Sequence, residues 1–203
     1  QGMAATVSVE DLASVLSQMA TDPDISWVEP DITLSLIESV IGTVKDLLSL
    51  SPFGLNLGQH VPWSIKDIGG TQSSTRSGDH RGTVDVDLFV LDTGAWHTDL
   101  NVISCTEFSS GAARPCTLIS DLDLNQHGTQ VAGVAAAIDN RADLVGVAPG
   151  ARVHTFKALN DLGFAELSSI IAIVEHVTKE KLAHPERPMV VNMSLGADVG
   201  TTA

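Results

Sequence analysis

Two side chains have the types and the setting that proton transfer requires. Asp92 follows the apolar run Leu88–Leu91 and is itself followed by Thr93-Gly94. His127 opens a stretch of small residues that runs to Gly133. A neutral imidazole can act as a general base, and a carboxylate at its other ring nitrogen fixes the tautomer and stabilises the cation. Asp92 and His127 form such a pair if the fold brings them together.

The residues around Asp92 and His127 limit the reactions that the two side chains can support. Small side chains after His127 predict a helix that packs close to a sheet, and the positive end of its dipole disfavours an imidazolium there. Asp-Thr-Gly also occurs in aspartic peptidases, but those need two carboxylates in one site, and this chain shows one such motif.

The elements that must position these residues alternate along the chain. Residues 71–82 indicate a loop, and the later pattern predicts strand, helix, strand, helix, strand. The predicted elements are strand Val84–Leu91, helix 127–138, strand Arg152–Ala158, helix Ala165–Leu182 and strand Met189–Met193. This alternation is typical of an α/β fold with a parallel sheet, whose sites gather at the carboxyl ends of its strands.

The N-terminal part has a different pattern. We expect strands over 4–9 and 25–28 around a helix over 10–20, which makes a compact β-α-β segment. Apolar residues then recur at three and four positions over 34–49. That spacing predicts an amphipathic helix with a packing face rather than a membrane anchor.

Composition excludes some classes of protein. The 203 residues carry a formal net charge of −14, which argues against a nucleic-acid partner. No run is long and apolar enough to span a membrane. Two cysteines, Cys105 and Cys116, are too few for the usual structural zinc site. They are either two free thiols or a disulfide, which would require an oxidising compartment.

Four motifs in this order resemble subtilisin-like serine peptidases. They are Asp92-Thr93-Gly94, His127-Gly128-Thr129-x-Val131-Ala132-Gly133, Gly146-Val147-Ala148-Pro149-Gly150-Ala151 and Val191-Asn192-Met193-Ser194-Leu195-Gly196. The resemblance implies a partial subtilisin-like parallel sheet with helices on both faces. It also implies a secreted serine endopeptidase, with Asp92 as the orienting carboxylate and His127 as the general base.

The same resemblance implies a site for an extended polypeptide substrate. Ser194, Leu195 and Gly196 would form one wall and Gly163 would lie in the other. Phe164, and Ala165 where the family usually has Gly, depart from the pattern of that second wall.

The family's oxyanion Asn and Gly-Thr-Ser nucleophile motif do not occur before Ala203. We therefore expect the triad Ser beyond this chain, and no peptidase activity from the chain alone. Ser194 belongs to the substrate-binding segment and is not expected to be the nucleophile. The alternative is a catalytically inactive binding module of the same family.

The resemblance also divides the chain. Residues 1–31 resemble the C-terminal half of an inhibitory propeptide, 32–58 form a linker with the amphipathic helix, and 59–203 begin the catalytic domain. The propeptide would act as an intramolecular inhibitor, and maturation cleavage would fall between Asp31 and Gln59.

One further set of residues resembles a family calcium site. It comprises side-chain oxygens of Gln59, Asp99 and Asn140 and backbone carbonyls of Ile138, Ala142 and Leu144. Six oxygen ligands suit a hard cation. Arg141 and Asp143 depart from the pattern, so an ordinary surface loop is the alternative.

A third function class is a metal-dependent hydrolase with His97, Asp99, Asp92 and His127 as ligands. Their spacing matches no simple ligand motif.

Overall fold

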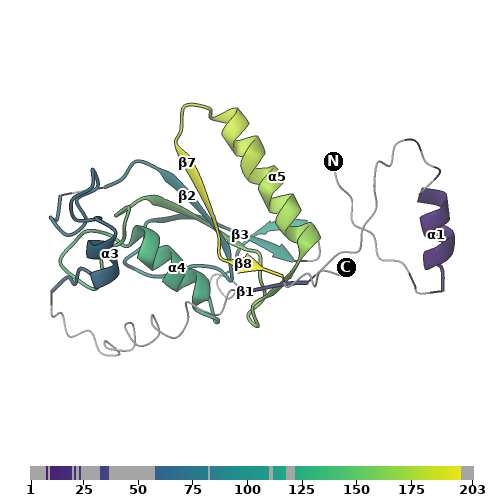
Figure 1. Cartoon of the computed structure of the whole chain (residues 1–203), viewed down its shortest axis with the longest axis horizontal. Coiled ribbons are helices and arrows are strands. Elements are labelled where there is room, and N and C mark those ends of the chain that lie inside the picture. The colour runs from purple at the N-terminus through teal and green to yellow at the C-terminus, as the bar shows by residue number, and fades with distance from the viewer. Residues whose placement is uncertain are drawn as a thin grey trace.

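The computed structural model describes residues 8, 10–19, 21, 23, 33–36, 58–81, 83–109, 112–117 and 122–197. Figure 1 shows the arrangement of their helices and strands. In chain order these are α1 (Leu12–Met19), β1 (Thr33–Leu36), α3 (Trp63–Asp67), β2 (Asp87–Asp92), β3 (Val102–Ser109), β4 (Ala112–Pro115), α4 (His127–Ala136), β5 (Arg152–Lys157), β6 (Phe164–Glu166), α5 (Leu167–Ala183), β7 (Met189–Met193) and β8 (Leu195–Gly196).

The main sheet has the strand order β4-β3-β5-β2-β7. Strands β3, β5, β2 and β7 are parallel, and β4 pairs antiparallel with β3. All six residues of β2 are buried, as expected for a strand with neighbours on both sides and both faces covered. The α/β fold predicted from the sequence is therefore confirmed.

Helices α4 and α5 cover opposite faces of this sheet. Successive side chains of β2 point to opposite faces, so each helix packs against alternate residues of the strand. Leu88 and Val90 of β2 pack in one apolar cluster with Ala132 and Ala136 of α4. Phe89 and Leu91 pack in a second cluster, which includes residues of α5. The site residues that end β2 and begin α4 thus rest on a packed core.

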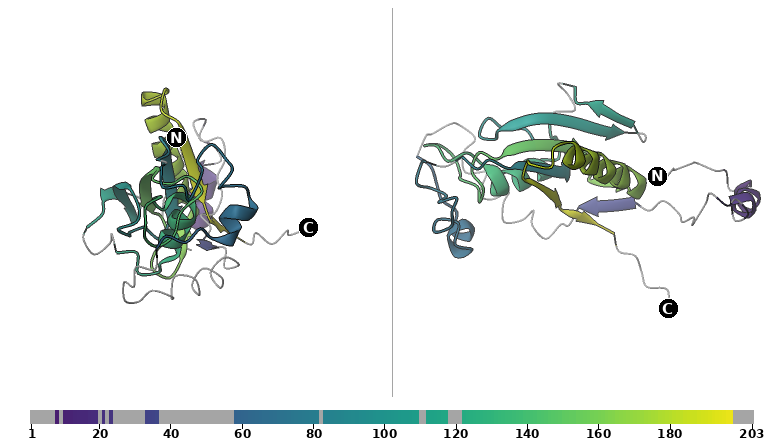
Figure 2. Two further views of the ribbon diagram at one scale, coloured as in Figure 1. Left: turned by 90° about the vertical axis from the view of Figure 1, so that its left-hand side faces the viewer. Right: turned by 90° about the horizontal axis from the view of Figure 1, so that it is seen from above.

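A second, smaller sheet has the order β6-β1-β8, with both pairings antiparallel. Figures 1 and 2 both show β1 and β8 side by side. Here the sequence prediction was wrong at two points. Residues 34–36 form a strand rather than the start of a helix, and Ala165 belongs to β6 rather than to α5. Backbone pairing with strands on both sides outweighs the helical periodicity.

Cys105 and Cys116 form a disulfide, with their Cα atoms 5.3 Å apart. Cys105 lies in β3, and Cys116 follows β4, so the bridge joins the two strands of an antiparallel pair. The sequence left the state of these two thiols open.

The predicted helix over 10–20 is confirmed by α1, which buries none of its residues and stands apart from the body of the molecule (Figure 2). The strands expected over 4–9 and 25–28, and residues 37–49 of the predicted amphipathic helix, lie outside the described residues. Within the described part of the chain, no helix is long and apolar enough to cross a membrane.

Candidate active site

Asp92 is the last residue of β2, and its side chain is fully buried. The His127 Nδ1 atom lies 2.8 Å from Asp92 Oδ1 and 2.9 Å from Oδ2, and the Thr93 amide donates to Oδ1 at 2.7 Å. An ionised carboxylate only accepts hydrogen bonds, so the Nδ1 atom must carry the proton. Neutral His127 therefore presents Nε2 as the nitrogen that can accept a proton.

His127 begins α4 at the point where the helix comes closest to the end of β2. A Cβ atom on Gly128 would lie 1.9 Å from the Gly94 carbonyl oxygen and 2.9 Å from the Asp92 Cβ. No side chain fits into that space. The glycine that follows His127 is thus what allows the imidazole to reach Asp92.

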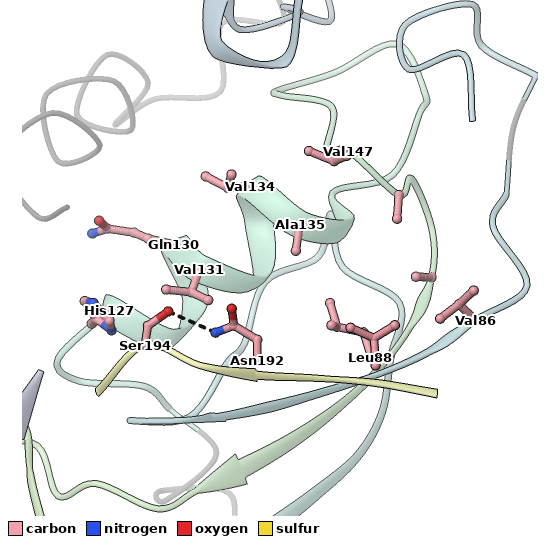
Figure 3. Close-up of a pocket in the computed structure, with 13 residues that line it drawn as sticks. Val86, Leu88, His127, Gln130, Val131, Val134, Ala135, Val147, Asn192 and Ser194 are labelled. Atoms are coloured by element: carbon pink, nitrogen blue, oxygen red, sulfur yellow. Dashed lines mark hydrogen bonds between the residues drawn. The ribbon is translucent and has the colours of Figure 1, made fainter. Parts of the chain in front are cut away.

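The Nε2 atom of His127 is buried and has no hydrogen-bond partner among the described residues. His127 lies at one end of a groove of about 450 Å³ between α4 and β7. Figure 3 shows Val131, Val134 and Ala135 of α4 along this groove, with Leu88 of β2 opposite them. A proton acceptor at the end of an apolar groove is suited to activating a hydroxyl group supplied from outside the described residues.

The residues predicted to bind substrate border β1. Ser35 pairs with Gly196 of β8 on one side and with Phe164 of β6 on the other, and Leu36 pairs with Leu195. Gly163, directly before β6, has a φ of 85°, a conformation that favours glycine. A segment of the chain itself therefore adds a strand to the edges of β6 and β8, which is also how an extended peptide binds in β-strand addition.

Ser194 connects this small sheet to the His127 groove. It lies between β7 and β8 and lines the groove together with His127. Figure 3 draws its hydroxyl accepting a hydrogen bond from Asn192 Nδ2, at 3.0 Å. Because β1 ends opposite Leu195, the C-terminal end of β1 is directed toward Ser194, which lines the groove.

The residues predicted to bind calcium also lie together. Gln59 Nε2 donates to the Ile138 carbonyl at 2.8 Å, and Asn140 Nδ2 donates to Asp99 Oδ1. Ala142 is bonded through its amide to Asn140 Oδ1 at 2.6 Å. Leu144 forms a bridge with His60, which adjoins Gln59. All six predicted ligands thus belong to one cluster of loops.

Two buried polar groups in this cluster are not fully stabilised by hydrogen bonds or opposite charges. Gln59 Oε1 is buried and has no hydrogen-bond partner among the described residues. Burial raises the pKa of Asp99 to about 6, and the charge of Asp143 adds to that rise, although Asn140 and His97 oppose it. A buried amide oxygen and a destabilised carboxylate are groups that an oxygen-seeking cation would satisfy.

The four residues of the metal-hydrolase alternative do not form one cluster. Asp92 and His127 bond to each other, whereas His97 Nδ1 accepts the Asp99 amide at 3.1 Å. Across the described residues, no three His, Cys, Asp or Glu side chains lie close enough to hold a metal ion together.

Two buried charged residues beside the pair, Asp123 and Lys157, were not predicted from the sequence. Asp123 accepts hydrogen bonds from both sides of the junction between β2 and α4. Lys157, the last residue of β5, donates to the Thr93 carbonyl at 2.9 Å and to Asp161. An Asp shortly before a predicted helix is a capping signal that was available for Asp123. Lys157 offered no such local signal.

Comparison with known proteins agrees with this geometry. Residues 25–203 match the model of the subtilase family, Peptidase S8. Subtilisin DY of Bacillus licheniformis is 36% identical over 147 residues, which are 71% of this chain and 48% of that protein. M-protease of Shouchella clausii is 32% identical over 184 residues, 90% of this chain and 42% of that protein.

A solved structure is similar as well. The psychrophilic subtilisin-like protease Apa1 from Pseudoalteromonas sp. AS-11 aligns with a TM-score of 0.50 and 27% identity, over 71% of this chain and 31% of that one. The chain belongs to the subtilase family, as its motifs indicated. It spans less than half the length of these relatives.

Proposed function

We propose that the full-length protein containing this chain is a serine endopeptidase that hydrolyses polypeptides through an Asp-His-Ser triad. Asp92 orients the imidazole, His127 is the general base, and the nucleophilic Ser lies beyond Ala203. The observation that carries the proposal is the buried Asp92–His127 pair at the end of the groove, in which His127 Nε2 has no hydrogen-bond partner among the described residues. Membership of the subtilase family supports it.

The proposed reaction follows from these two side chains. The serine Oγ bonds to the carbonyl carbon of the scissile peptide while its proton passes to His127 Nε2. Asp92 stabilises the imidazolium, which then gives the proton to the leaving amine as the C–N bond breaks. Water then attacks the acyl-enzyme. His127 takes a proton from that water and gives it to the serine Oγ as the bond between the acyl group and the serine breaks. An Asn side chain beyond Ala203 would stabilise the oxyanion.

The test uses full-length protein and a peptide substrate. A serine-directed reagent should abolish hydrolysis, and a zinc chelator should not. Asp92→Asn should lower kcat by about 10⁴-fold, because the Nδ1–H tautomer is no longer enforced. Inactivation by the chelator alone would favour a metal hydrolase. A folded protein without hydrolysis, and without reaction with the reagent, would favour the inactive binding module.

We further propose that the N-terminal part inhibits the enzyme before maturation, with 1–31 as a propeptide-like segment and 32–58 as a linker. Strand β1 supports an inhibitory role, since it fills the space between β6 and β8 that a substrate strand would take. This strand lies within the predicted linker, so the inhibitory segment extends through Leu36. Cleavage should therefore fall after Leu36 and before Gln59.

Sequencing the N-terminus of the matured protein tests this placement. We expect a first residue between 37 and 59, and residual binding of the released segment as a competitive inhibitor. A mature N-terminus at or upstream of Leu36, or beyond Gln59, would contradict the proposal.

A structural calcium ion is proposed for the Gln59–Asp99 cluster. The donor set fits, because oxygen atoms from Gln59, Asp99 and Asn140 and three loop carbonyls would surround the ion. When bound, calcium would neutralise the buried Asp99 charge and hold Gln59 against the 138–144 loop. The ion takes no part in the proposed reaction.

Calcium should raise the Tm of the full-length protein, and Asp99→Ala should remove that increase. Asp67→Ala, at the end of the short helix α3, is a control that should keep it. An unchanged Tm on calcium addition to metal-free wild-type protein would refute the site.

Secretion is proposed on the ground of the Cys105–Cys116 disulfide, because disulfides are typical of proteins from oxidising compartments.

A further inference from the structure

The Asp92–His127 hydrogen bond joins two elements that are 35 positions apart in the chain. Asp92 ends β2, and His127 begins α4. A small displacement of the helix along the strand would break this bond. Something at this junction must therefore hold the first turn of α4 in place.

Asp123 lies at the junction and is 8% exposed. Its Oδ1 atom accepts the Thr93 hydroxyl at 2.7 Å and the Gln126 amide at 3.0 Å. Its Oδ2 atom accepts the Thr129 amide at 2.8 Å and the Thr129 hydroxyl at 2.7 Å. Each carboxylate oxygen thus has two donors, and one of the four donors comes from the turn after β2.

Thr93 transmits this contact to the reacting pair. Its amide donates to Asp92 Oδ1 at 2.7 Å, and its hydroxyl accepts the Gly128 amide at 3.1 Å while donating to Asp123. Thr93 is therefore hydrogen-bonded to Asp92 through its amide and to Gly128, the residue after His127, through its hydroxyl. Lys157 restrains the Thr93 carbonyl at 2.9 Å.

The charge of Asp123 suits the position. The first backbone N–H groups of a helix have no partner within the helix, and its dipole favours an anion at that end. No residue of α4 is acidic in its first turn, and the residue before the helix makes no side-chain cap. Asp123 supplies the cap from three residues further upstream.

We propose that Asp123 is a positioning residue for catalysis, which clamps the start of α4 to the turn after β2 and so sets the geometry of the Asp92–His127 pair. Its catalytic consequence rests on the proposed peptidase function. It never touches substrate, and its effect passes through Thr93 and the first turn of α4. An Asn at this position would place two donors against an amide nitrogen, which cannot accept them.

In the full-length protein, Asp123→Asn should lower kcat by about 10- to 100-fold and leave KM within about threefold, because a small misplacement of the base slows chemistry more than binding. Thr93→Val should do the same, whereas Thr93→Ser, which keeps the hydroxyl, should retain activity. The double variant should be little worse than either single variant, because both break one network.

Asp87→Asn is the matched control. Asp87 is a fully buried carboxylate at the opposite end of the same strand, and its loss should lower the Tm without a change in kcat below the melting range. Equal losses of kcat in Asp87→Asn and Asp123→Asn would overturn the proposal, as would an unchanged kcat in Asp123→Asn.

A second readout does not depend on activity. The proton on His127 Nδ1, held by Asp92, should give a downfield proton NMR signal that is absent in His127→Ala and lost or broadened in Asp123→Asn. An unchanged signal in Asp123→Asn would contradict the clamp even if the full-length protein proved inactive. Conversely, inactivity of the wild type together with loss of this signal in Asp123→Asn would refute the peptidase function alone.

Discussion

At the scale of single residues, buried carboxylates set the chemistry and the stability of β2. Asp92 at one end decides which nitrogen of His127 carries the proton. Asp87 at the other end binds Arg152 Nε at 2.6 Å, Arg187 Nη2 at 2.6 Å and His154 Nε2 at 3.1 Å. Because Arg187 precedes β7 and Arg152 begins β5, Asp87 ties three neighbouring strands together.

The pKa of Asp87 makes this tie pH-dependent. Burial by itself would raise the pKa, but hydrogen bonds from Arg152, His154 and Arg187 outweigh it and lower the pKa from 3.8 to about 2. A carboxylate with a depressed pKa stabilises the folded state above its unfolded pKa, and this contribution disappears as the pH falls to the folded value.

We therefore expect the stability difference between wild-type protein and Asp87→Asn to shrink by about 2 kcal/mol between pH 4 and pH 2. Urea denaturation of both proteins across this range measures it. A difference that stays constant from pH 5 to pH 2 would show that the Asp87 charge contributes nothing to folding.

Local motifs explain why some of these residues were predictable. Asp92 follows an apolar strand and His127 opens a helix of small residues, so each stands out within a few neighbours. Asp87 depends instead on partners that only the fold brings near, such as Arg152, which lies 65 positions away. Sequence periodicity carries no information about such partners.

At the scale of elements, the close contact of α4 with the end of β2 places the base. Gly128 has no room for a side chain, whereas a Cβ on Gly133 of the same helix would meet no atom within 4 Å. The two glycines therefore have different roles, although they belong to one motif.

Gly128→Ala should push α4 away from β2, destabilise the protein by about 3 kcal/mol and abolish the downfield signal of His127. Gly133→Ala should instead stabilise it by about 0.5–1 kcal/mol, because alanine favours the helix. Thermal unfolding of both variants checks this. Equal effects on Tm would contradict the close-contact interpretation.

Strand β1 shows where periodicity misleads. The apolar spacing over 34–49 predicted a helix that included residues 34–36, yet those residues pair with β6 and β8. Two open strand edges provide backbone partners that no property of residues 34–36 reveals. The elements of the main sheet were predicted better, because burial on both faces leaves a long apolar run in the sequence.

At the scale of the whole molecule, the described residues form one wall of a site. The groove between α4 and β7 is apolar, with His127 at its end, and Val190, Val191 and Met193 of β7 are exposed. These surfaces suit the proposed further part of the full-length protein, which would pack on β7 and bring the proposed triad serine to His127. The chain spans less than half the length of its relatives, which agrees with such a part.

The most direct test of this account is covalent labelling of the full-length protein with a fluorophosphonate probe, followed by peptide mapping. The account predicts one labelled serine, located after Ala203, and loss of that labelling in His127→Ala because the base is missing. Labelling of Ser194, or labelling of His127→Ala at the wild-type rate, would contradict it.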